Sequence, residues 1–185
     1  MPSLHEFAKP HVPRDVAAQI RSYQRIQWPH LDELIGPKLW DVPPDSTART
    51  FILLDGEKLI SHAEANFRPV EHANRTFNVG GLSAVFTYPA YRGKGLAQQV
   101  VRAATAFLDA SDADFAMGFC GERLRGFYTN LGWEWLDGAR ILYGDRANPT
   151  QHEGTIVMAH FIPARGDDAR TLLGSEPLYV GERTW

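Results

Sequence analysis

A strand, a glycine-rich basic turn, a helix and a second strand follow one another in the middle of this chain, and few folds accommodate that order. The first strand is expected at residues 75–89, with Gly80-Gly81 in its middle, where glycines often mark a bulge or a close backbone approach. Apolar residues then recur at helical spacing from Leu96 to Leu108. Residues 114–120 are apolar, as in a short buried strand. This order predicts a parallel crossover and therefore an α/β fold.

The rest of the chain adds a first helix and strands on both sides of the crossover. Residues 13–27 are expected to be helical, because Asp15 suits a first turn and Val16, Ile20 and Tyr23 share one face. We predict a single domain over residues 1–185 with a mixed, mostly antiparallel, twisted sheet flanked by helices. The other expected elements are strands at 48–55, 58–67, 133–138, 155–162 and in the tail 177–185, and a helix at 121–133 that Gly132 ends.

Composition narrows the class of protein. The chain has 185 residues, of which 44% are hydrophobic, so one domain with a sizeable core is expected. A net charge of −3 argues against a nucleic-acid partner, and no apolar stretch approaches the ~18 residues of a membrane span. The start of the chain lacks the apolar run of a signal peptide, and the single cysteine, Cys120, fits a reducing compartment. We therefore expect a cytoplasmic protein. The seven histidines show no metal-ligand spacing, so no metal is expected.

The basic turn before the second helix has the features of an anion site. Glycines allow backbone amides to approach a ligand closely, and the helix N-terminus that follows carries partial positive charge. Arg92 and Lys94 add full charges, which suits a phosphate or pyrophosphate. Lys94 is followed by Gly95 rather than Ser or Thr, and a third glycine is missing, so neither a Walker loop nor a dinucleotide fingerprint fits. The alternative is a basic turn whose glycines serve geometry only.

These residues resemble a known family. The stretch Arg92–Ala97 matches the Arg/Gln-x-x-Gly-x-Gly/Ala motif of the GNAT superfamily of acetyl-CoA-dependent N-acetyltransferases, and GFYTNLGW at 126–133 resembles its second motif. The resemblance covers residues 47–162 and implies acetyl-CoA as the acetyl donor. It also implies that Val85 and Thr87 bind the acetyl and pantetheine groups through their main chain. The residues implied to hold the pyrophosphate are Arg92, Gly93, Lys94, Gly95, Leu96 and Ala97.

Within this superfamily the chain resembles the aminoglycoside 2′-N-acetyltransferases. Residues 132–163 are similar to a segment of that family that begins Gly-Trp and reaches Asp/Glu-Gly-Thr before the last strand, and the chain also ends in a tryptophan, Trp185. The resemblance implies an aminoglycoside acceptor, for which the segment 1–46 would supply N-terminal helices and a pocket wall. The tail 163–185 would close that pocket.

Three departures from that family point to a less cationic acceptor. Ser83 stands where the family has a glutamate base, His152, beside Glu153, replaces an aspartate, and Arg183 replaces another. Polycationic drugs need carboxylate-lined pockets. Kasugamycin, which carries a carboxylate and a single primary amine, would fit the exchange, with Arg183 or His152 pairing its carboxylate. The alternative for Arg183 is a solvated tail residue.

The roles of single residues follow from the chemistry of acetyl transfer. The departing thiolate needs a proton, and the resemblance implies that Tyr128 supplies it, although a core aromatic is the alternative. Ser83 falls at the position of the base, but a serine cannot take up a proton unaided. A water chain, an already neutral amine, Glu64 or His62 remain open. Cys120 leaves a covalent route open as well.

Other readings of the function also remain. The acceptor could be another small amine or a protein N-terminus, or the chain could be a non-catalytic module that binds CoA. Strands near the C-terminus of this fold often pair between protomers, which makes a homodimer an expectation.

Overall fold

The computed structural model describes residues 2–29, 47–163, 165, 169–170, 173 and 176–182. Its chain divides into two compact units, which we call the N-terminal unit (Met1–Asn66 and Ala84–Ala104) and the C-terminal unit (Phe67–Ser83 and Thr105–Trp185). The elements are helices and a mostly antiparallel set of strands, so the predicted α/β class is confirmed. Strands β3 (Lys58–His72) and β4 (Arg75–Thr87) and helix α3 (Leu96–Asp109) contribute residues to both units.

The N-terminal unit contains an antiparallel set of strands. Strand β2 (Arg49–Asp55) pairs with β3 through the turn at Gly56, whose φ of +61° explains the glycine. Strand β1 (Ser3–Ala8) pairs with the other edge of β2. We did not expect β1 from the sequence, because it is a short edge strand with an exposed Leu4 and no regular alternation.

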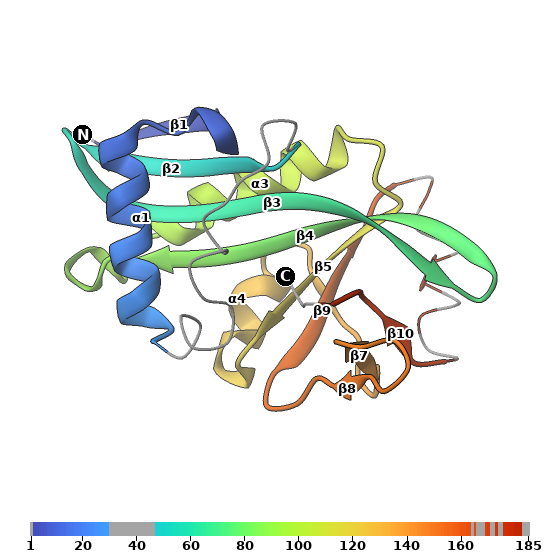
Figure 1. The fold of residues 1–185 in the computed structure, drawn as a ribbon. Coiled ribbons are helices and arrows are strands. Elements are labelled where there is room, and N and C mark those ends of the chain that lie inside the picture. The colour runs from blue at the N-terminus through green and yellow to red at the C-terminus, as the bar shows by residue number, and fades with distance from the viewer. Residues whose placement is uncertain are drawn as a thin grey trace. The chain divides into compact units, whose positions relative to one another are not determined.

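Helix α1 (Arg14–Gln27) confirms the helix expected at 13–27 and follows a single 3-10 turn, η1 (Lys9–His11). It lies across β2 and β3 in Figure 1, where it is blue. Gln19 fixes its position, because its side chain donates to the Glu57 carbonyl at 2.9 Å and accepts from the Leu59 amide at 2.9 Å. The buried residues of this interface are Val16, Ile20, Ile52, Leu59 and Phe86.

The C-terminal unit contains the predicted crossover. The first part of β4 pairs in parallel with β5 (Phe115–Cys120), from Val79↔Phe115 to Gly81↔Met117. Gly80 is required there, because a Cβ atom at this position would lie 2.6 Å from Leu108 Cδ2 and 3.2 Å from Ala116 Cβ. The close backbone approach expected at the glycine pair is therefore confirmed.

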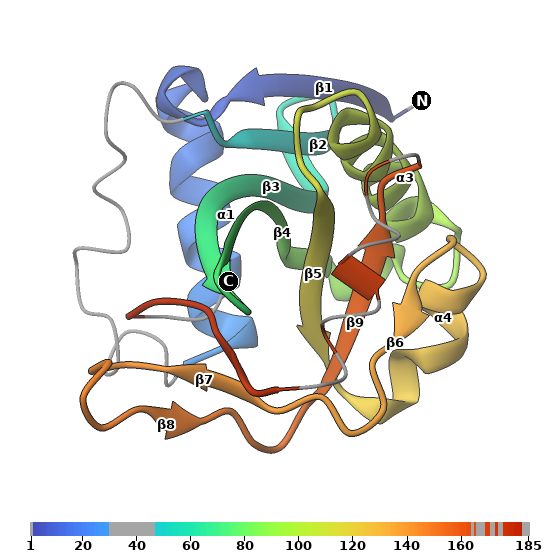
Figure 2. The ribbon, with the colours of Figure 1, turned by 90° about the vertical axis from the view of Figure 1, so that its right-hand side faces the viewer.

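Beyond β5, antiparallel partners extend this set of strands. Strand β9 (Ile156–Phe161) pairs with β5, and β6 (Glu134–Trp135) pairs with β9. A separate three-stranded sheet has the order β10 (Leu178–Tyr179), β7 (Ile141–Tyr143) and β8 (Thr150–Gln151), and the ribbon of β7 and β8 is seen in Figure 2. The tail strand expected within 177–185 is thus β10, in parallel pairing with β7.

The helix predicted at 121–133 is shorter than expected. A 3-10 turn, η4 (Glu122–Leu124), leads into α4 (Arg125–Thr129). The chain then closes in a Schellman motif: the Trp133 amide donates to the Tyr128 carbonyl at 3.1 Å and the Gly132 amide to the Thr129 carbonyl at 3.1 Å. Gly132 has the left-handed φ of +83° that this motif needs, so its predicted role as the helix stop is confirmed.

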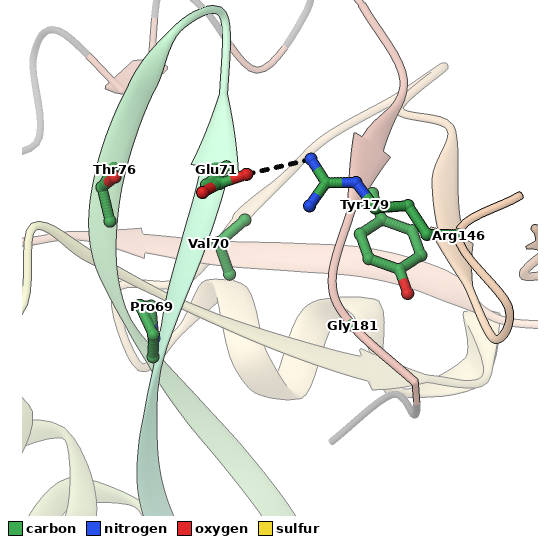
Figure 3. A pocket seen from close by; sticks show the side chains of 7 residues that line it. All are labelled: Pro69, Val70, Glu71, Thr76, Arg146, Tyr179 and Gly181. Atoms are coloured by element: carbon green, nitrogen blue, oxygen red, sulfur yellow. Dashed lines mark hydrogen bonds and ion pairs between the residues drawn. The ribbon is translucent and has the colours of Figure 1, made fainter.

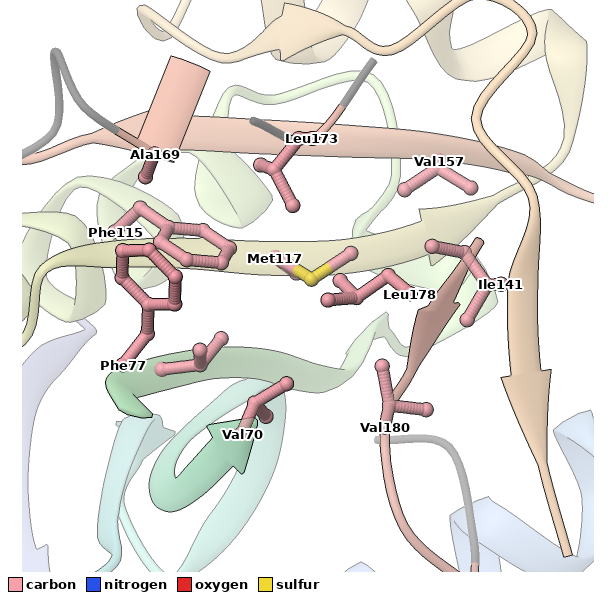
Figure 4. Close-up of a cluster of buried hydrophobic side chains, with 11 residues drawn as sticks. Val70, Phe77, Phe115, Met117, Ile141, Val157, Ala169, Leu173, Leu178 and Val180 are labelled. Carbon is pink, nitrogen blue, oxygen red and sulfur yellow. The ribbon is translucent and has the colours of Figure 1, made fainter. Parts of the chain in front are cut away.

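The core of the C-terminal unit lies on β4, β5 and the small sheet (Figure 4). Phe77 meets Phe115 edge to face, with ring centroids 5.9 Å apart. The buried residues of this core are Val70, Phe77, Val79, Phe115, Met117, Ile141, Val157, Ala169, Leu173, Leu178 and Val180.

In the part of the chain that the structure describes, no helix has the length and apolar character that crossing a membrane requires.

Candidate active site

The loop before α3 has the conformation of an anion cradle. The 3-10 turn η3 (Pro89–Tyr91) leads into it, and Gly93 and Gly95 adopt φ angles of +75° and +72°. An added Cβ would meet nothing within 4 Å at Gly93, so the space beside the loop is open. Helix α3 begins at Leu96, and the first amides of a helix have no intrahelical acceptor. The loop therefore presents main-chain N–H groups and a helix dipole to one place.

The two cations of this loop differ in what they contact. The Arg92 guanidinium donates to the Thr87 carbonyl from Nε at 3.0 Å and to Gln27 Oε1 from Nη2 at 3.2 Å. Arg92 thus ties the loop to the end of β4 and to the last turn of α1. The Lys94 ammonium instead lies 5.2 Å from the centroid of the Tyr91 ring.

Residues outside the motif extend the positive charge. The Lys58 ammonium lies 4.7 Å from the Tyr88 ring centroid and 5.2 Å from that of Tyr91, so two ammonium groups, those of Lys58 and Lys94, contact the ring of one tyrosine. Sequence reasoning missed Lys58. Its position directly after the Asp55-Gly56 turn was the available signal, but only the fold brings that turn to the loop.

The end of β4 has an unusual backbone. Ala84 adopts a left-handed φ of +50°, and its carbonyl accepts a hydrogen bond from His62 Nδ1 at 2.8 Å. The Phe86 carbonyl accepts one from Ser61 Oγ at 3.0 Å. Since both of these carbonyls face β3, Val85 between them presents its main-chain groups to the opposite edge of the strand. The Thr87 carbonyl already accepts from Arg92, and its hydroxyl lies 2.8 Å from Ser61 Oγ.

Tyr128 is held from two sides in the C-terminal unit. Its carbonyl accepts the Schellman bond from Trp133, and its ring meets that of Trp133 edge to face at 6.5 Å. Trp133 is itself anchored, because its indole N–H donates to Thr105 Oγ1 at 3.1 Å. The Tyr128 side chain is 4% exposed, and burial, followed by the nearby Cys120, raises its pKa above the usual tyrosine range. The phenol is therefore protonated at neutral pH.

Cys120 lacks the surroundings of a nucleophile. Burial, and then the carboxylate of Glu122, raises the pKa of its thiol to about 11. A thiol with this pKa is almost fully protonated near pH 7, and only the thiolate attacks.

The resemblance to acetyl-CoA-dependent transferases, taken with this protonated thiol, predicts direct transfer without a covalent intermediate. We therefore expect the Cys120→Ala variant to keep its kcat within about twofold. Mass spectrometry of the enzyme mixed with acetyl-CoA should find no acetylated protein. An acetyl-enzyme that disappears in Cys120→Ala would instead establish a covalent route.

His152 has a partly apolar environment. Its ring lies 4.5 Å from that of Phe119 and 6.2 Å from that of Tyr143, and its Nε2 hydrogen-bonds with Thr155 Oγ1. Burial lowers its pKa, so the imidazole is neutral at neutral pH. Glu153 beside it is exposed. Ser83 lies half-buried on β4 in the same unit, whereas Arg183, Trp185 and the segment 30–46 lie outside the described residues.

A surface pocket of the C-terminal unit contains none of the residues expected in the site. Between two of its lining residues, the Arg146 guanidinium bonds with Glu71 Oε2 at 2.9 Å, and it lies 5.5 Å from the Tyr179 ring centroid (Figure 3). The pocket is lined by Pro69, Val70, Glu71, Thr76, Arg146, Tyr179 and Gly181.

Among the described residues, no group of three histidine, cysteine or acidic side chains is placed to hold a metal.

Comparison with known proteins shows the family of this chain. A family model described as an acetyltransferase (GNAT) domain matches residues 19–136. None of the curated proteins matches the chain.

Solved structures share the fold at low sequence identity. The GNAT family N-acetyltransferase YhbS from Escherichia coli, solved in complex with CoA, is 19% identical with a TM-score of 0.65, covering 98% of this chain and 89% of its own. Escherichia coli ElaA is 13% identical with a TM-score of 0.59, covering 86% and 99%. A putative acyl-CoA N-acyltransferase from Klebsiella pneumoniae is 16% identical with a TM-score of 0.56, covering 88% and 98%.

Proposed function

Because this chain belongs to the GNAT family of acetyltransferases, we propose that it transfers the acetyl group of acetyl-CoA to an amine of an aminoglycoside-type antibiotic. The expected position of that amine is 2′. Kasugamycin is the leading acceptor. The observation that carries this choice is the absence of acids at three positions: Ser83, His152 and Arg183 stand where polycation-binding relatives would have carboxylates. His152, as a neutral imidazole packed on Phe119, offers no negative charge to a polycation and no positive charge to the kasugamycin carboxylate, so the charge pairing in this proposal rests on Arg183.

The residues of the N-terminal unit fit the phosphates of acetyl-CoA. The left-handed Gly93 and Gly95, the open space beside Gly93 and the start of α3 favour a pyrophosphate. The ammonium groups of Lys58 and Lys94 add charge near it. Arg92 would act indirectly, by holding the loop through Thr87 and Gln27.

The chain's own groups would carry the chemistry of transfer. Acetyl-CoA supplies an activated thioester. The main chain of Val85, turned away from β3, would hold the acetyl group, and a backbone N–H at this position would stabilise the oxyanion as it forms. Tyr128, protonated because of its burial, would give a proton to the departing sulfur.

The test is a thiol-release assay with acetyl-CoA against kasugamycin, kanamycin, gentamicin and a mixed peptide. Turnover with kasugamycin alone supports the proposal. Turnover with the polycationic drugs keeps the aminoglycoside class but rejects the reasoning about lost acids. Turnover with peptide alone favours a protein N-terminus as the acceptor. Binding of acetyl-CoA without turnover of any amine favours a non-catalytic module.

The loop itself can be tested by Gly95→Ala. A left-handed conformation costs an L-residue roughly 1–2 kcal/mol, so we expect the Kd of acetyl-CoA, measured by calorimetry, to rise about five- to thirtyfold. Gly138→Ala is the matched control, because Gly138 also has a positive φ, +79°, and open space around it. That variant should lose stability and keep its acetyl-CoA affinity. Equal affinity in both variants would exclude the loop from the donor site.

A further inference from the structure

A buried histidine in the N-terminal unit has one nitrogen without a partner. His62 on β3 is 0% exposed, and its Nδ1 lies 2.8 Å from the Ala84 carbonyl oxygen. A carbonyl oxygen can only accept, so Nδ1 carries the proton and Nε2 carries the lone pair. Nε2 is also buried and finds no hydrogen-bond partner among the described residues. The bond to Ala84 thus fixes the tautomer of His62, and its Nε2 remains a hydrogen-bond acceptor without a partner.

An orphaned acceptor in a well-packed interface needs an explanation, because leaving a buried polar atom unpaired destabilises the fold. Among the described side chains, one other buried atom is unpaired, Gln24 Oε1 on α1. Both atoms are acceptors and both belong to the N-terminal unit. A molecule that pairs with either atom must therefore donate a hydrogen bond, as an amine or a water molecule can.

The surroundings of His62 keep its ring neutral. Burial is the main cause of a pKa below the usual value, against an opposing contribution from the bond to Ala84. The nearest charges are Glu64 on the same strand and Lys9 from η1, which pair with each other at 2.6 Å. The His62 ring stacks on Phe86 at 5.0 Å, and Tyr23 of α1 packs against the same Phe86. Burial raises the pKa of the Tyr23 phenol, so Tyr23 is uncharged. The lone pair on Nε2 is therefore available at neutral pH.

The position of His62 connects it to the transfer reaction. Its bond holds the carbonyl of Ala84, the left-handed residue directly before Val85, whose main chain we assigned to the acetyl group. Ala84, Val85 and the phosphate loop belong to the same unit as His62. The ring that carries the unpaired Nε2 is thus bonded, through its Nδ1, to the residue directly before the strand segment assigned to the acetyl group.

We infer that His62 is the base of the reaction and that its Nε2 takes the proton of the attacking amine, directly or through one water. This inference rests on the proposed function. The amine nitrogen bonds to the thioester carbon, the carbon–sulfur bond breaks, and the nitrogen loses a proton to Nε2. The imidazolium keeps its Nδ1–H on Ala84 and later releases the new proton to solvent. The departing thiolate takes up a proton from Tyr128, which recovers one from solvent.

The test is the pH profile of kcat/KM for the acceptor in the wild type and in His62→Gln. In the wild type, activity should fall as the pH drops through a pKa below 6.5, because the protonated ring has no lone pair. Glutamine can still donate to the Ala84 carbonyl, so the fold should survive. Turnover should fall about 10²- to 10⁴-fold, the acid limb should disappear, and acetyl-CoA affinity should not change.

Two further variants separate this role from a structural one. His72→Gln removes another buried histidine, 6% exposed, at the far end of β3, and should keep the acid limb. His62→Phe keeps a ring on Phe86 but leaves Ala84 unbonded, so it should lose turnover together with stability. A His62→Gln enzyme with an unchanged acid limb would overturn the role of His62 while the proposed function stands. A wild type that binds acetyl-CoA and acetylates no amine would overturn both.

Discussion

Tyr128→Phe should lower kcat by about 100-fold or more, which is the usual range for loss of a general acid. The hydroxyl group makes no hydrogen bond to another described residue, so its removal should leave the structure unchanged. The Kd of acetyl-CoA should therefore stay the same. Because burial raises the pKa of this phenol, the wild type should show no alkaline fall in kcat from Tyr128 below about pH 10, the free-tyrosine value.

Tyr179→Phe is the control for this experiment. The Tyr179 hydroxyl donates to the Gly144 carbonyl at 2.6 Å, so its loss should cost about 1 kcal/mol of stability and leave turnover unaffected. If Tyr128→Phe turns over as fast as the wild type, the proton reaches the sulfur by another route and Tyr128 is a core aromatic.

Lys9→Met should destabilise the N-terminal unit by about 3 kcal/mol, since it leaves a buried carboxylate unpaired. The Lys9 ammonium lies 2.6 Å from Glu64 Oε1, and the Glu64 side chain is only 9% exposed. For a chain of this size we expect a fall in Tm of about 6–12 °C, measured by calorimetry. The same change removes a charge that acts on His62, so the acid limb of activity should shift as well.

The controls for Lys9→Met use the same chemistry in two other settings. Arg146→Met breaks an ion pair with Glu71 in which both side chains are exposed, and should cost under about 1 kcal/mol. The double variant Lys9→Met/Glu64→Leu replaces the buried pair by apolar groups and should recover most of the loss. A Lys9→Met protein as stable as the wild type would mean that water solvates Glu64.

The long elements could be predicted from the sequence because their signals are local. Helices α1 and α3 each bury one periodic face, and the parallel crossover follows from the order of the elements around α3. The strands of the small sheet are two or three residues long, too short to show a period, and β7 and β8 were missed for that reason. The shortening of α4 depends on Schellman bonds that only become visible with coordinates.

In the candidate site, too, features with a local sequence signal could be predicted and features that depend on distant residues could not. Gly93 and Gly95 need positive φ, and glycine is the residue that reveals such a position in a sequence. The left-handed residue of β4 is an alanine, Ala84, so nothing in its residue type pointed to it. The partner of Arg92 on α1 lies 65 positions away, and that of His62 lies on another strand. Such pairs depend on strand register and helix placement, which one sequence does not determine.

The hydrogen bonds made by Arg92 have a consequence for how the two proposed substrates affect each other's affinity. Through Gln27, Arg92 joins the loop proposed to bind the phosphates of acetyl-CoA to the final turn of α1, after which the chain enters the segment expected to face the acceptor. Two ligands that act on one connected element influence each other's affinity by the same factor. If acetyl-CoA raises the affinity for the acceptor through this end of α1, the acceptor raises the affinity for acetyl-CoA by the same factor. The same equality holds if the effect is a loss of affinity.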